Sequence, residues 1–86
     1  MLAPNPFSGG TSVNFSLSHA DEVEVGVFDL SGRAVRALQR GRLVAGTHRF
    51  DWNGRDEQGR RVAAGVYFVR LEATGRHVES KLVKLR

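Results

Sequence analysis

The residues most able to do chemistry in this 86-residue chain lie in one stretch, 52–67. Its glycines at 54 and 59 have the spacing of a phosphate-binding loop, and Arg60 and Arg61 follow them. Such a loop needs a lysine for the phosphates, a hydroxyl for magnesium and a helix after it. Arginines stand in those positions here, and the chain runs on into a strand-like segment. The sequence therefore argues against nucleotide binding.

The same stretch also carries oxygen ligands of the kind that calcium prefers. A calcium loop of the EF-hand type that began at residue 51 would need glycine at its sixth position and glutamate at its twelfth. These positions hold Asp56 and Val62. The favoured interpretation is structural, because an acid at 56 and a glycine at 59 are typical of a type I turn. A nonstandard calcium site at 51–57, using Asp51, Asn53, Asp56 and Glu57, stays open.

Other catalytic or metal-binding patterns are weak. His19, His48 and His77 come from three distant segments and lack acidic neighbours at ligand spacing. No nucleophile motif is present, and the carboxylate pairs at 21–22 and 56–57 have no apolar pocket to raise a pKa. The sequence predicts a protein that is not an enzyme and has no cofactor and no metal.

The charge of the chain limits the classes of partner that it could bind. The net charge of +4 comes from eleven arginines and two lysines, and the arginines are spread along the chain without interleaved aromatic residues. This pattern argues against nucleic-acid binding. No apolar run approaches the length of a membrane span, and we expect no signal peptide directly before the fold. We expect residues 1–86 to be a single module, monomeric in isolation and cut from a longer secreted protein.

Alternation of apolar and polar residues dominates the chain and predicts strands with one buried face. Seven strands are expected, at about 2–7, 11–18, 22–29, 33–40, 46–53, 65–74 and 76–85. Only 34–40 could pass for a helix, and two nearby glycines make a helix there marginal. Short strands with frequent turns indicate an all-β fold, an immunoglobulin-like antiparallel β-sandwich of about seven strands.

Three residues of 52–67 are expected to be structural. Trp52 ends a strand and is the largest available core residue, while Tyr67 follows Gly65 at the start of the next strand. Sandwiches often place a tyrosine there whose hydroxyl ties down the crossing loop. The expected core comprises Val13, Phe15, Leu17, Val23, Val25, Val27, Trp52, Tyr67, Val69 and Leu71.

The order of motifs resembles a known family. Pro4, Asn5, Pro6 and Phe7 open the chain, the alternating strands and the Trp52 loop follow, and Lys81, Leu82, Val83, Lys84, Leu85 and Arg86 close it. This arrangement resembles the FlgD-like Ig-like C-terminal domain, related to the flagellar hook-capping protein, and the sorting domains of type IX secretion. One departure is Gly26, which stands in mid-strand where a larger side chain is usual.

The resemblance implies a non-catalytic module that directs a fused enzyme or adhesin through type IX secretion and attaches it to the outer cell surface. Its partners would be the secretion machinery, cell-surface components and the parent protein. The final segment, 81–86, would be the recognition strand, with Lys81 and Lys84 as exposed charges that a receptor reads. The alternative is a structural module of a flagellar hook cap or another extracellular assembly. A carbohydrate-binding module is a third, weaker reading.

Overall fold

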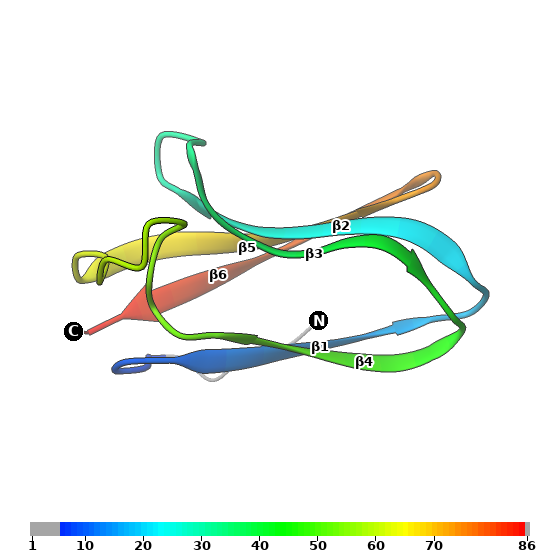
Figure 1. Ribbon diagram of the computed structural model, residues 1–86, viewed down its shortest axis with the longest axis horizontal. Coiled ribbons are helices and arrows are strands. Elements are labelled where there is room, and N and C mark those ends of the chain that lie inside the picture. The colour runs from blue at the N-terminus through cyan, green and yellow to red at the C-terminus, as the bar shows by residue number, and fades with distance from the viewer. Residues whose placement is uncertain (1–5, 86) are drawn as a thin grey trace.

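The fold is all-β and is built from two antiparallel sheets (Figure 1). The computed structural model describes residues 6–85. Six strands lie within this part of the chain. They are β1 (Thr11–Leu17), β2 (Asp21–Asp29), β3 (Ala34–Leu43), β4 (Gly46–Trp52), β5 (Gly65–Ala73) and β6 (Arg76–Lys84).

The two sheets face each other as the layers of a sandwich (Figure 1). One contains β1 and β4, and the other has the order β3-β2-β5-β6. Hairpins join β2 to β3 and β5 to β6, and the connections at 18–20, 44–45 and 53–64 carry the chain between layers. Each sheet therefore presents one face to a shared interior, which explains the alternation in the sequence.

The core lies between the sheets and matches the expected one. All ten predicted core residues are buried, and Val27 and Val69 are completely inaccessible to solvent. Two further core residues, Phe7 and Leu82, are 6% and 1% exposed. These two come from the ends of the chain and close one side of the sandwich.

The segment expected at 33–40 is a strand from Ala34 onward, as predicted, and not a helix. It belongs to β3, which extends to Leu43 and pairs with β2. The pairing contains two register shifts, after Val25 and after Val27 on β2. Of the strand expected at 2–7, residues 2–5 lie outside the described residues. Phe7 makes an isolated parallel bridge to Lys84, and a seventh strand stays a prediction.

Gly26, the departure noted in the sequence, has a packing reason. A Cβ atom at this position would lie 3.2 Å from Cε1 of Phe28 and 3.4 Å from the carbonyl oxygen of Arg36. The Phe28 ring therefore folds back over Gly26. The guanidinium carbon of Arg70 lies 4.4 Å from the centroid of that ring, a cation–π contact on the outer face of the sheet.

Candidate functional site

Trp52 fills the end of the core, as its position in the sequence predicted. It is 2% exposed, and its ring meets those of Phe7 and Tyr67 edge to face at centroid distances of 5.9 Å and 5.5 Å. Its indole N–H donates a 2.9 Å hydrogen bond to the Arg55 carbonyl oxygen. Because an indole N–H needs a partner when buried, this bond fixes the loop that leaves β4.

Tyr67 ties down the other end of the same loop. Its hydroxyl donates a 2.6 Å hydrogen bond to the carbonyl oxygen of Ala63, four residues upstream. Gly65 between them has φ of 150°, a conformation that favours glycine. Burial raises the pKa of the Tyr67 hydroxyl above its ordinary value of 10.0, with a smaller contribution from the nearby charge of Asp29. The predicted tyrosine tie is present.

The middle of the loop is the turn predicted from its acid and its glycine. The Oδ1 atom of Asp56 accepts hydrogen bonds from the amides of Gln58 and Arg60, each at 3.0 Å. The Gly59 amide donates to the Asp56 carbonyl oxygen at 3.0 Å. The Asp56 amide donates to the Arg60 carbonyl oxygen at 2.9 Å. Gly59 has φ of 80°, so a side chain at this position would be strained.

A second turn, between β2 and β3, has the same construction. The Oδ1 atom of Asp29 accepts from the amides of Ser31 and Arg33, each at 3.0 Å, and the Gly32 amide donates to the Asp29 carbonyl oxygen. The 2.7 Å bond from the Ser31 hydroxyl, followed by that from the Arg33 amide, holds the pKa of Asp29 below its ordinary 3.8. Two Asp-x-x-Gly-Arg segments thus form equivalent turns, which line one shallow pocket together.

The four possible calcium ligands of 51–57 each have a different partner. Asp51 pairs with Arg49 at 3.0 Å, and the Asn53 side-chain oxygen accepts from the Arg55 amide. Glu57 contacts Arg36 at 3.3 Å and also accepts from the Ala37 amide. The Asp56 carboxylate serves its own turn. Each of the four side chains takes part in a separate interaction, which favours the structural interpretation.

The three histidines are likewise separate. His19 lies 3.2 Å from the Ser18 hydroxyl, His48 lies 2.7 Å from the Val44 carbonyl oxygen, and His77 is exposed on β6. Within residues 6–85, no three His, Cys, Asp or Glu side chains gather as a metal site would require. The same residues contain no helix suited to crossing a membrane.

Lys84 is not where the recognition hypothesis required it. It was expected to be an exposed charge, yet it is 2% exposed. Its Nζ atom donates a 3.2 Å hydrogen bond to the Val62 carbonyl oxygen, and its Cε atom would lie 3.0 Å from a Cβ atom on Gly54. Burial, and to a lesser extent the nearby charge of Arg61, lowers the pKa of Lys84 below its ordinary 10.5.

The period of two along β6 explains this result. Residues 82 and 84 share one face of the strand, and residues 81, 83 and 85 share the other. Leu82 is buried, so Lys84 points into the same interior, while Lys81 and Leu85 are exposed and Val83 is half-buried. Because one face of β6 is buried, two lysines three residues apart on this strand cannot both face solvent. This signal was available in the sequence and was missed.

The opening motif is placed only in part. Phe7 is buried against Trp52, and its amide and carbonyl oxygen bond to Val83 and Leu85 at 2.9 Å and 2.8 Å. Pro6 is exposed, whereas Pro4 and Asn5 lie outside the described residues, as does Arg86. The two ends of the described chain therefore support each other.

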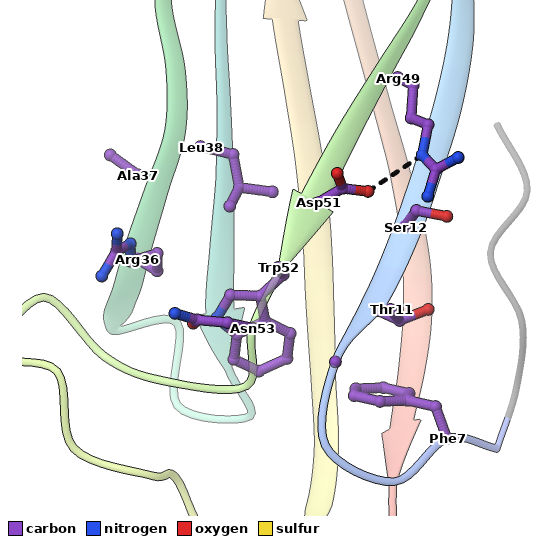
Figure 2. Close-up of a pocket in the computed structure, with 11 residues that line it drawn as sticks. Phe7, Thr11, Ser12, Arg36, Ala37, Leu38, Arg49, Asp51, Trp52 and Asn53 are labelled. Atoms are coloured by element: carbon purple, nitrogen blue, oxygen red, sulfur yellow. Dashed lines mark hydrogen bonds and ion pairs between the residues drawn. The ribbon is translucent and has the colours of Figure 1, made fainter.

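A groove opens beside Trp52, between β3 and β4 (Figure 2). Its volume is about 590 Å³. Arg36, Ala37 and Leu38 of β3 form one wall, and the end of β4 forms the other. The Thr11 hydroxyl, which also lines the groove, is buried without a hydrogen-bond partner among the residues described. No local sequence pattern predicts this groove, because it depends on the order of the strands in the two sheets.

The fold and the packing around Trp52 and Tyr67 define an immunoglobulin-like β-sandwich module. The family model of the FlgD Ig-like domain matches residues 3–77. The chain belongs to this family.

Two curated relatives of the chain are flagellar proteins. The basal-body rod modification proteins FlgD of Salmonella typhimurium and Salmonella typhi are each 40% identical to this chain over 55 residues. The match covers 64% of this chain and 24% of each relative, so the chain spans about a quarter of their length. The crystal structure of FlgD from P. aeruginosa has the same fold, with a TM-score of 0.66 and 23% identity, covering 86% of this chain and 64% of that chain.

These relatives correct the function expected first. The prediction of a type IX sorting and attachment module was wrong, because the matches are to rod modification proteins of the flagellum. The partners expected with it, the secretion machinery and a fused enzyme, are corrected for the same reason. The burial of Lys84 independently removes one of the two charges on which receptor reading depended.

Proposed function

We propose that this chain is a non-catalytic structural module of a flagellar hook cap or a related extracellular assembly, as the alternative reading of the sequence stated. The observation that carries the proposal is its 40% identity to basal-body rod modification proteins over 55 residues. The family match over residues 3–77 supports it. Residues 1–86 are then one module of a larger protein that acts outside the cytoplasm.

The geometry of the loop after β4 suits a structural role. The conspicuous polar groups of 51–57 hold turns and ion pairs, and the strongest contacts of Trp52 and Tyr67 fix the loop against the core. Rigid sandwich modules of this kind present surfaces for assembly, and their function depends on those surfaces and not on the fold alone.

A domain exchange tests the proposal. The matching domain of the Salmonella typhimurium relative is replaced by this chain, and the chimera is expressed in a strain that lacks the relative. We expect the chimera to restore swimming in soft agar, whereas a chimera that carries an unrelated immunoglobulin-like domain does not. If both chimeras accumulate to equal levels and neither restores swimming, the proposal is wrong.

A further inference from the structure

One side of the sandwich is open. β3 pairs only with β2, and β4 pairs only with β1, so each strand has an edge without a neighbouring strand among residues 6–85. Both edges border the groove, and a two-residue connection at 44–45 joins the strands (Figure 1). Backbone N–H and C=O groups on such edges can pair with another chain.

The interior is incompletely covered on this side. No residue of β3 is fully buried, and Trp52 is the only fully buried residue of β4. Four apolar side chains of β3 and β4 that pack on the core stay partly exposed, namely Val35, Leu38, Leu43 and Phe50. On β1, β2 and β5, by contrast, three inward-facing residues in each strand are buried. A further strand on this side would cover apolar surface that the chain itself leaves open.

Of the two edges, that of β4 is the better template. Its seven residues pair with β1 in one unbroken register, from Thr11 with Trp52 to Leu17 with Gly46. The pairing of β3 with β2 is interrupted twice. Register irregularities bend a strand and hinder further pairing, and β4 also contains no proline. An added strand would therefore extend the β1–β4 sheet.

The charges near this edge indicate an acidic partner. The side chain of Arg49, on β4 itself, is 67% exposed, and it lines the groove together with Arg36 and one acid, Asp51. The ion pair of Arg49 with Asp51 lies in solvent, so it holds the arginine weakly. A second copy of this chain would bring like charges together, since the net charge is +4.

We propose that the free edge of β4 is a docking site for an extended segment of a partner protein in which apolar and acidic side chains alternate. Backbone hydrogen bonds to β4 would supply the pairing, as in other cases of strand addition. Apolar side chains of the segment cover Phe50 and Leu38, and its acidic side chains face Arg49. The proposal deepens the proposed function, on which it rests, by naming the face that the assembly uses.

Titration of the isolated chain tests the docking site separately from the domain exchange. The probe is an eight-residue peptide that alternates valine and glutamate, and amide exchange is followed by NMR. Alternate residues of an edge strand direct their N–H groups outward. We therefore expect exchange to slow at alternate amides of residues 46–52 only when the peptide is present. A peptide that alternates valine and lysine should bind at least tenfold more weakly.

Two matched charge-reversal variants test whether the acidic peptide contacts Arg49. Arg49→Glu should raise the Kd for the acidic peptide about tenfold, since an attraction becomes a repulsion. Arg60→Glu makes the same change of charge in the turn after β4, outside both edge strands, and should have a smaller effect. Equal effects of the two variants would overturn the proposed location.

Three other results would overturn the proposal. Protection of β3 or β6 in place of β4 would place the docking edge elsewhere. Shifts at the arginines without amide protection, reproduced by an acidic polysaccharide, would indicate a polyanion surface. Self-association through β4 in the absence of peptide would make a second copy the occupant. None of these results bears on whether the domain exchange restores swimming.

Discussion

The Nζ atom of Lys84, on the last strand, donates a hydrogen bond to the carbonyl oxygen of Val62, in the long loop between β4 and β5. The bond measures 3.2 Å and lies in the interior, where Lys84 is 2% exposed. Gly54 packs directly against the lysine stem. The last strand and the loop after Trp52 are thereby joined by a side chain that its residue type would place in solvent.

Truncation of this side chain should destabilise the fold. Lys84→Ala removes a buried stem and leaves the Val62 carbonyl oxygen without this donor, so we expect a loss of about 1–3 kcal/mol in the free energy of unfolding. Lys84→Met keeps most of the stem and should cost less. Lys81→Ala, on the exposed face of β6, should change stability by no more than about 0.5 kcal/mol. Urea denaturation measures all three, and equal effects of the two alanine variants would contradict the packing described.

Trp52 should contribute more to stability than any other single side chain. Trp52→Ala removes the ring that packs against Phe7 and Tyr67, and we expect a loss of about 3–5 kcal/mol. Trp52→Phe retains an aromatic ring but loses the donor to the Arg55 carbonyl oxygen, so its cost should be intermediate. The midpoint of chemical denaturation gives both values. A Trp52→Ala variant with nearly native stability would show that the ring is not a core residue.

Acid should weaken the fold through two carboxylates. The Thr74 hydroxyl donates to Asp21 at 2.8 Å and is the largest cause of the lowered pKa of that carboxyl, as the Ser31 hydroxyl is for Asp29. Because both folded-state pKa values lie below 3.8, the stability they provide is present above that pH. It is lost as the pH falls through the folded values.

Two hydroxyl deletions test this pH dependence. Thr74→Val and Ser31→Ala should each reduce the loss of unfolding free energy on acidification, and the double variant should reduce it further. Denaturation curves at a series of pH values below 5 measure the effect, with curves near neutrality as the reference. An unchanged acid dependence in the double variant would show that these hydrogen bonds do not lower the pKa values.

Calcium should not stabilise the chain. The carboxylate of Asp56 accepts from two amides of its own turn, and Asp51 and Glu57 pair with arginines. We expect the melting temperature to be the same in calcium and in chelator, because a ligand bound only by the native state would raise it. Asp56→Ala is the matched variant and should lower the melting temperature equally in both solutions. A melting temperature that is higher in calcium than in chelator, with a difference that Asp56→Ala abolishes, would contradict the turn interpretation.

Much of the fold could be predicted because a period of two reports burial directly. The alternation at Val13, Phe15 and Leu17, and again at Val23, Val25 and Val27, identified strands and their inner faces. Turn chemistry was equally local: Asp56 and Gly59 predicted their turn, and the same Asp-x-x-Gly-Arg pattern forms the equivalent turn at Asp29.

What could not be predicted depends on contacts between distant segments. The open side exists because β3 and β4 are both edge strands, and no local pattern specifies which strands become neighbours. The burial of Lys84 was within reach of the sequence, but its residue type outweighed its position beside Leu82 on one face of β6. The function expected first was wrong for a related reason. The motifs that carried it are shared by modules with different partners, so the motifs indicated the fold more reliably than the role.

The most direct measurement of the central claim is electron microscopy of basal bodies from the Salmonella strain that carries the domain exchange. We predict that hooks are present when this chain replaces the native domain, and that their number falls when the inserted chain carries Trp52→Ala. Hooks absent from a strain in which the folded chimera is exported at the normal level would contradict a structural role in flagellar assembly.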